Sequence, residues 1–129
     1  RETMRLTRYA VALAAVLTAT QTLAEKPKVT QINTTGEFIA LCSVDTDDPV
    51  YNAAMSFCLG YIDAVMDYHE ALTAGSKNRP VACPDTEVTR KQVVMTVLEW
   101  ANNNAQYLKT ETPVHGVMRA AAEKWPCSG

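Results

Sequence analysis

The sequence predicts a small all-α bundle of three main helices and one short N-terminal helix, stapled by two disulfides. Apolar residues recur at three- and four-residue steps in the longer segments, which is the period of a helix with one buried face. No segment alternates between apolar and polar residues for more than a few positions, as a strand would. The chain also has 129 residues and four cysteines, enough for one domain with a disulfide framework.

The first 24 residues have the composition of a secretory signal peptide. Arg5 and Arg8 follow Met4, an eleven-residue apolar run covers positions 9–19, and Ala24 ends a stretch suited to cleavage. This run is too short to span a membrane, which takes about 20 residues. We therefore expect residues 1–24 to be removed on export, leaving no membrane span. Residues 25–33 should then form a flexible arm before a helical domain at 34–129.

The short first helix is marked by its start. Thr34 and Glu37 are spaced as a capping box, in which each side chain accepts a hydrogen bond from the backbone of the other residue. This box predicts a helix that ends at about Cys42. Phe38 and Leu41 should lie on its buried side with that cysteine.

The next helix is the longest that the sequence predicts, from about Pro49 to Ala74. Asp48 can accept a hydrogen bond from a free backbone N–H, and Pro49 suits the first helical position. Gly75 is a natural stop. Its expected buried stripe comprises Tyr51, Ala54, Met55, Cys58, Tyr61, Ile62, Val65, His69 and Leu72.

A polar connection at 76–87 leads to the third helix, which has a second capping box. Thr89 and Gln92 form the box, Val88 and Val93 form a hydrophobic staple around it, and three asparagines at 102–104 end the helix. Its expected core face comprises Val94, Val97, Leu98 and Ala101.

The last helix should begin at Thr112-Pro113 and end before Pro126. Proline suits the first helical position, whereas a proline further along cannot continue a helix. The residues expected to point inward are Val114, Val117, Met118, Ala121 and Trp125.

All four cysteines lie in the part that would be exported: Cys42, Cys58, Cys83 and Cys127. Their spacings of 16, 25 and 44 residues lack the close pairs of a zinc site, so we expect disulfides and no metal. This part carries nine basic and thirteen acidic residues, so its formal net charge is 9 − 13 = −4. No basic run occurs, so nucleic acid is not an expected partner.

The long helix also concentrates charged groups: Asp63, Asp67, His69 and Glu70. A metal or acid–base site would need further groups from another element, and a run of charge on a helix is usually its solvated face. Paired cysteines leave no thiol nucleophile, and no Gly-x-Ser-x-Gly elbow is present. We therefore expect no catalytic residues and no cofactor.

Four segments, in order, carry a family resemblance. Cys42 follows a turn that begins at Gly36, and residues 57–62 read Phe-Cys-Leu-Gly-Tyr-Ile. Cys83-Pro84 is followed by Val-Thr at 88–89 and Gln-Val at 92–93, and residues 125–127 read Trp-Pro-Cys. This series resembles the Rap/Tai family, the immunity proteins of type VI secretion amidase effectors. The resemblance extends over about residues 36–127.

The resemblance implies a periplasmic, non-catalytic protein that binds a peptidoglycan amidase effector and blocks its active-site cleft, often as a homodimer. We expect its contacts to lie in loops. One candidate is 76–82, with Lys77 and Arg79. The other is 102–111, with Asn103, Asn104 and Tyr107. We favour the second, because it combines an aromatic anchor with amide groups.

Two other classes of function remain open. A stand-alone periplasmic stress or chaperone-like protein, without a cognate effector, would expose apolar surface at low pH. A small-ligand carrier would need an apolar cavity, which no sequence can show.

The disulfide pairing that we expect is Cys42 with Cys58 and Cys83 with Cys127. The first bridge would join the short helix to the long one. The second would join the connection before the third helix to the end of the fourth. Four cysteines allow three connectivities, and the sequence does not exclude the other two.

Overall fold

The computed structural model describes residues 31–75 and 77–128, so the expected signal peptide and most of the expected arm lie outside the described residues. The described residues form helices and no strand, which confirms the predicted all-α class. No described helix has both the length and the apolar character needed to cross a membrane. The elements are α1 (Thr35–Cys42), α2 (Tyr51–Thr73), α3 (Arg90–Asn103), the short 3₁₀ turn η1 (Ala105–Tyr107) and α4 (Pro113–Lys124).

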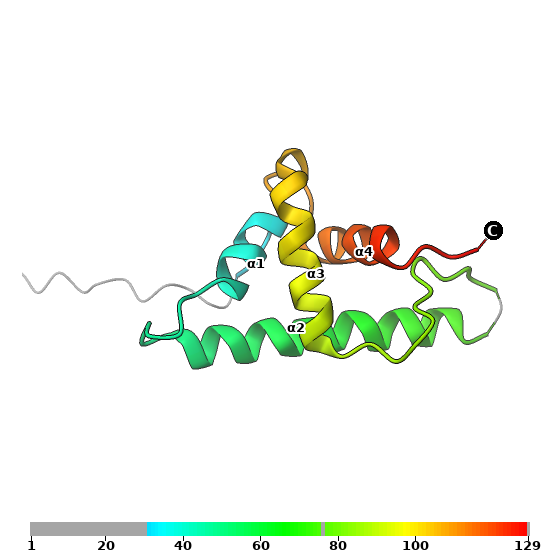
Figure 1. Ribbon diagram of the computed structural model, residues 1–129, viewed down its shortest axis with the longest axis horizontal. Coiled ribbons are helices and arrows are strands. Elements are labelled where there is room, and N and C mark those ends of the chain that lie inside the picture. Colours follow the sequence, from blue (N-terminus) through cyan, green and yellow to red (C-terminus); the bar gives the residue numbers. More distant parts are fainter. Residues whose placement is uncertain (1–30, 76, 129) are drawn as a thin grey trace, which may run out of the picture.

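The long helix α2 forms one side of the molecule, and α3 stands across it with α1 and α4 to either side (Figure 1). Helix α3 packs against both α2 and α4, while α1 contacts the other three helices. The buried residues come from all four helices and form one core. Its members are Phe38, Cys42, Cys58, Ile62, Val65, Val93, Val94, Val97, Trp100, Ala101, Val117 and Ala120.

Both predicted capping boxes are present. The Thr34 hydroxyl accepts a hydrogen bond from the Glu37 N–H at 3.2 Å, and the Glu37 carboxylate accepts one from the Thr34 N–H at 3.0 Å. The Thr89 hydroxyl and the Gln92 side chain make the equivalent pair at 3.3 and 2.8 Å. These bonds satisfy backbone donors that the first turn of a helix leaves free, which explains why α1 and α3 begin where the sequence predicts.

The predicted start of α2 was two residues early. Asp48 accepts hydrogen bonds from the N–H groups of Val50, at 2.8 Å to its side chain, and Tyr51, at 2.9 Å to its carbonyl. Asp48 and Pro49 therefore form a turn in front of the helix, and Tyr51 is the first helical residue. Aspartate and proline suit a turn as well as a helix start, so local chemistry did not separate the two.

Two expected core residues are instead exposed. Leu72 is 45 % exposed, because it lies more than a turn beyond Val65, the last buried residue of α2. Val114 is 36 % exposed, because α4 buries a different stripe from the one expected. That stripe comprises Pro113, Gly116, Val117, Ala120 and Ala121.

Two disulfides connect the helices, with the pairing that we expected. Cys42, the last residue of α1, is bonded to Cys58 in α2, and both residues are buried. Cys83, in the connection before α3, is bonded to Cys127, beyond the end of α4. The second bridge holds that connection beside the end of the chain, where the Cys83 N–H also donates to the Trp125 carbonyl at 2.8 Å.

Candidate functional site

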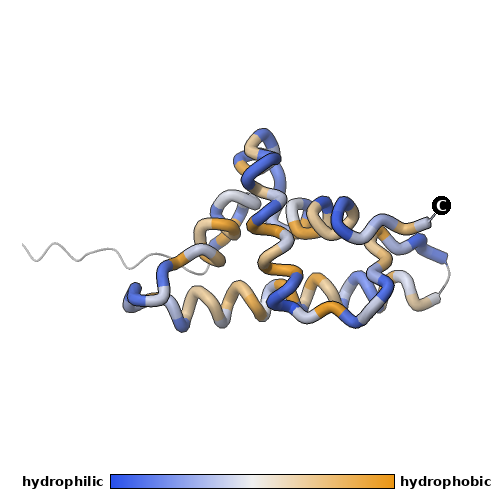
Figure 2. The backbone as a smooth tube through the Cα atoms, viewed as in Figure 1, coloured by the Kyte–Doolittle hydropathy of each residue, from blue (hydrophilic) through white to orange (hydrophobic). Residues whose placement is uncertain are grey.

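The contact region that the sequence favours is 102–111. In the structure α3 extends to Asn103 and α4 begins at Pro113, so the connection between them covers residues 104–112. It lies at the end of α3 that points away from α2 (Figure 1), and most of it is hydrophilic (Figure 2). It begins at Asn104, whose side-chain amide donates to the Trp100 carbonyl at 2.9 Å and so closes the end of α3. We call this stretch the 104–112 segment.

The N-terminus of α1 holds the 104–112 segment through its backbone. The Thr35 N–H donates to the Glu111 carbonyl at 2.8 Å, and the Gly36 N–H donates to the Leu108 carbonyl at 2.7 Å. The first N–H groups of a helix have no partner within the helix, so these carbonyls complete the start of α1. A side chain at position 36 would place its Cβ 2.9 Å from the Leu108 oxygen, so only glycine permits this approach.

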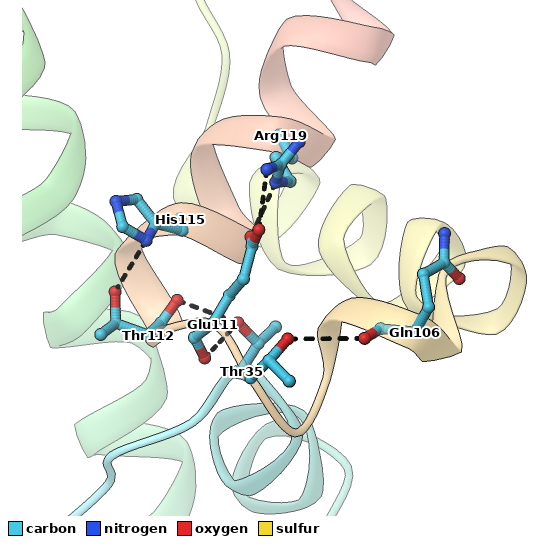
Figure 3. A network of polar contacts seen from close by, with 7 residues as sticks. Thr35, Gln106, Glu111, Thr112, His115 and Arg119 are labelled. Atoms are coloured by element: carbon cyan, nitrogen blue, oxygen red, sulfur yellow. Dashed lines mark hydrogen bonds and ion pairs between the residues drawn. The ribbon is translucent and has the colours of Figure 1, made fainter.

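The Thr35 side chain adds a second connection beneath the segment. Its hydroxyl is fully buried and lies 2.9 Å from the Thr112 carbonyl oxygen and 3.2 Å from that of Glu111, so one proton serves two acceptors (Figure 3). Gly116 of α4 lies against this threonine: a Cβ there would be 2.2 Å from the Thr35 methyl group. The absence of a side chain at Gly116 therefore allows α1 and α4 to meet.

The Arg119 side chain of α4 also holds the 104–112 segment, through contacts with Glu111 and Tyr107. Its Nε and one terminal nitrogen each donate to a carboxylate oxygen of Glu111, both at 2.7 Å (Figure 3). Its guanidinium also lies 4.4 Å from the centre of the Tyr107 ring. The Tyr107 ring in turn stacks on Trp100, with centroids 6.0 Å apart and planes 12° apart. Tyr107 is therefore held between Trp100 and Arg119, and is not the free anchor that the sequence suggested.

The ion pair between Glu111 and Arg119 favours the charged form of both side chains. The hydrogen bonds from Arg119, with its positive charge, hold the pKa of Glu111 below the usual carboxyl value. Glu111 in turn raises the pKa of Arg119. At the start of α1, the backbone N–H groups of Asn33 and Thr34 lower the pKa of Glu37.

Low pH is expected to weaken both the Glu111–Arg119 ion pair and the capping box at the start of α1. A carboxyl group whose pKa is lower in the folded state stabilises that state above its unfolded pKa, about 4.3. This stabilisation is lost as the pH falls through the lower folded value. Replacing Glu111 and Glu37 with glutamine should therefore reduce the fall in melting temperature between pH 6 and pH 3. Thermal melts by circular dichroism test this, with Glu99→Gln as control, and an unchanged pH dependence would contradict it.

The outward face of the segment differs from the residues that the sequence singled out. Asn103 is exposed, whereas Asn104 and Tyr107 are half-buried and engaged within the protein. Figure 3 shows the Gln106 side chain pointing away from the network of polar contacts. The exposed side chains of the segment that the sequence analysis did not name are Ala105, Gln106, Lys109 and Thr110.

The second predicted contact region, at 77–82, is also held in place. Lys77 and Arg79 are exposed. The Val81 N–H donates to the Nε2 atom of His69 at 2.9 Å, which ties this loop to α2. The loop lies beside the end of α2, away from the 104–112 segment (Figure 1), so the structure does not bring the two predicted contact groups together.

The charged cluster on α2 is divided between structural contacts and solvent. Asp63 pairs with Arg90 of α3 at 2.6 Å, and His69 holds the 77–82 loop. Within residues 31–75 and 77–128, no three His, Cys, Asp or Glu side chains are grouped so that they could hold a metal ion.

Sequence reasoning missed the residues that hold the segment: Thr35, Gly36, Glu111, Gly116 and Arg119. Their contacts join parts of the chain up to 77 residues apart, which no periodic pattern encodes. Gly36 and Gly116 did offer one signal in the sequence. A glycine inside a helix costs about 1 kcal/mol relative to alanine, so its presence there often indicates close packing.

Comparison with known proteins gives one match. A family model described as Rap1a immunity proteins matches residues 34–127. This range begins at the capping residue of α1 and ends at the last cysteine, so it includes both disulfides and every helix found in residues 31–75 and 77–128. No curated protein and no solved structure matches the chain.

Proposed function

The chain belongs to the Rap1a immunity protein family, and from this membership we propose that it neutralises a peptidoglycan amidase effector of a type VI secretion system in the periplasm. The signal-like composition of residues 1–24 supports export. Two disulfides fit an oxidising compartment such as the periplasm. The protein acts by binding the effector and not by chemistry of its own.

The observation that carries this proposal is the set of hydrogen bonds and packing contacts that hold the 104–112 segment. An inhibitor that enters an enzyme cleft loses less conformational entropy when its inserted segment is already ordered. Here α1 supplies two backbone hydrogen bonds and Arg119 supplies two more from its side chain. The exposed side chains of Gln106 and Lys109 at the tip can donate hydrogen bonds to polar groups in the cleft. The Thr110 hydroxyl already donates to the Gln106 carbonyl at 3.5 Å, so it can accept a hydrogen bond from the partner.

A binding assay with a charge reversal tests the proposal. We expect a secreted peptidoglycan amidase to be encoded beside this protein, to bind it and to lose peptidoglycan hydrolysis in the complex. Lys109→Glu should weaken binding at least about tenfold, since it removes a donor and introduces repulsion at a buried contact. Lys124→Glu makes the same charge change at an exposed position in the last turn of α4 and should leave the affinity unchanged.

Two outcomes would contradict this reading. If Lys77→Glu abolishes binding while Lys109→Glu does not, the 77–82 loop makes the contact instead. If no peptidoglycan hydrolase binds and expression protects no cell from one, the immunity proposal is wrong. An acid-exposed, dye-binding surface that protects many client proteins would then favour a stand-alone stress protein.

Arg119 should act by positioning the segment. Arg119→Ala removes the clamp on Glu111 and Tyr107 without changing the exposed tip, and we expect it to weaken amidase binding about three- to tenfold. Arg119→Lys should not restore the affinity, because an ammonium group cannot reproduce the paired geometry of a guanidinium. Isothermal titration calorimetry measures this, and full affinity in the lysine variant would show that charge alone is sufficient.

We also propose a homodimer. The groove between α2 and α3, about 340 Å³, is lined mostly by apolar side chains, with Arg90 and Lys91 beside them, and Met95 is 60 % exposed. Light scattering of Met95→Glu, compared with the unsubstituted protein, tests whether this groove is the dimer contact. A dimer that survives the substitution would place the contact elsewhere.

A further inference from the structure

A separate apolar cleft lies between the second half of α2, the connection before α3, and α4. It encloses about 260 Å³. Its floor consists of buried core residues: Val65, Val93, Val117 and Ala121. Half-buried Met66, Val88, Met118 and Trp125 form its walls. None of these residues belongs to the 104–112 segment, so the proposed amidase contact leaves the cleft free.

The walls of the cleft are held by cross-links. Ala82 and Pro84 line it on either side of Cys83, whose disulfide to Cys127 ties this wall to the end of the chain. The Cys83 N–H also donates to the carbonyl of Trp125, which lines the neighbouring wall. The cleft is therefore formed before any ligand arrives, and a ligand need not order it.

The charge at the cleft has one sign. Asp67 and Glu70 are the only Asp, Glu, Lys or Arg residues among its lining side chains, and both are exposed. Neither forms an ion pair with any residue in 31–75 or 77–128. The α2–α3 groove differs, because Arg90 and Lys91 line it. Arg90 is paired with Asp63, whereas Lys91 forms no ion pair within residues 31–75 and 77–128. The two apolar surfaces should therefore prefer ligands of opposite charge.

We propose that this cleft binds a small amphipathic amine. Its apolar body, of about six to ten carbon atoms, would occupy the space between Met66, Met118 and Trp125, since a cavity of about 150 Å³ already accepts benzene. Its cationic group would lie at the mouth beside Asp67 and Glu70. This ligand class does not depend on the amidase, so the proposal stands or falls separately from the immunity function.

Methionine methyl NMR on the purified protein tests the proposal, because the four methionines of the described residues divide between the two surfaces. Met66 and Met118 line the cleft, whereas Met55 and Met95 line the α2–α3 groove and serve as internal controls. Titration with hexylamine should shift the first pair saturably and leave the second pair unchanged. Hexanoate at the same concentrations should not shift Met66 or Met118. No saturable shift with hexylamine, or an equal response to hexanoate, would overturn the proposal.

A pair of double variants tests the role of the rim. Asp67→Asn with Glu70→Gln should weaken hexylamine binding about three- to tenfold, since each exposed charge pair contributes modestly. Glu99→Gln with Glu123→Gln removes the same net charge from exposed positions outside the cleft, and its affinity should equal that of the unsubstituted protein. Equal weakening in both double variants, or no weakening in the first, would overturn the assignment of the cation to Asp67 and Glu70.

Discussion

Removal of the Cys42–Cys58 disulfide is expected to lower the melting temperature of the domain by about 12–24 °C. Opening a loop of this length costs about 3 kcal/mol in the chain-entropy model, and each kcal/mol lowers the melting temperature of a domain of this size by about 4–8 °C. A small domain has only about 5–15 kcal/mol of stability in total. Cys58 has no exposed surface and Cys42 only 5 %, so their sulfurs also lose packing partners.

Replacing the cysteines with serine in one variant and with alanine in another separates the stability due to loop closure from the stability due to packing. Cys42→Ser with Cys58→Ser should melt lower than the double alanine variant, because a buried hydroxyl without a partner costs about 1–3 kcal/mol. At Cys83 and Cys127, which are half-exposed, the serine and alanine pairs should melt alike. Circular dichroism melts under non-reducing conditions measure both. A double alanine variant at 42 and 58 that melts within about 3 °C of the unsubstituted protein would contradict the loop-closure argument.

Gly116→Ala is expected to destabilise the protein by about 2–3 kcal/mol, although alanine is the better helix former. The added methyl group would lie 2.2 Å from the Thr35 methyl carbon and 2.7 Å from its hydroxyl oxygen. Thr35 cannot turn aside freely, since it is fully buried and its hydroxyl is bonded to carbonyls of the 104–112 segment. Either α1 moves from α4 or the segment loses its support, so amidase binding should weaken as well.

Gly60→Ala is the matched control. Gly60 is also inside a helix, but no atom lies within 4 Å of the position that its Cβ would take. The substitution should stabilise the protein by about 0.5–1 kcal/mol, because alanine loses less backbone entropy on folding. Urea unfolding of the two variants measures the difference. A Gly116→Ala variant that gains as much as Gly60→Ala would show that α1 and α4 are not in tight contact.

The elements of the fold were largely predictable because their signals are local. A capping box involves residues three apart. The starts of α1 and α3 were therefore predicted correctly, from Thr34 with Glu37 and from Thr89 with Gln92. The errors also came from local reasoning. Asp48 and Pro49 suit a turn and a helix start equally, and the exposure of Val114 depends on which neighbours cover α4.

The candidate site was predictable only as a region. The asparagines before it and the single proline after it marked the connection between α3 and α4, but the roles of its residues depend on other elements. Tyr107 reads as a free aromatic anchor in the sequence, whereas Trp100 and Arg119 contact its two faces in the structure. Gln106 and Lys109, which have no distinctive pattern, are the side chains that the fold exposes.

The sequence by itself determined the helical class and the starts of α1, α3 and α4, because these depend on hydrogen bonds and periodicity over a few residues. Only the tertiary structure decided which side chains reach a partner and which hold the chain together. The Thr35 hydroxyl meets the Thr112 carbonyl across 77 residues of sequence, and the apolar cleft is assembled from three separate helices and a disulfide-held connection. Such contacts form only when helices pack against one another, so no local pattern in the sequence predicts them.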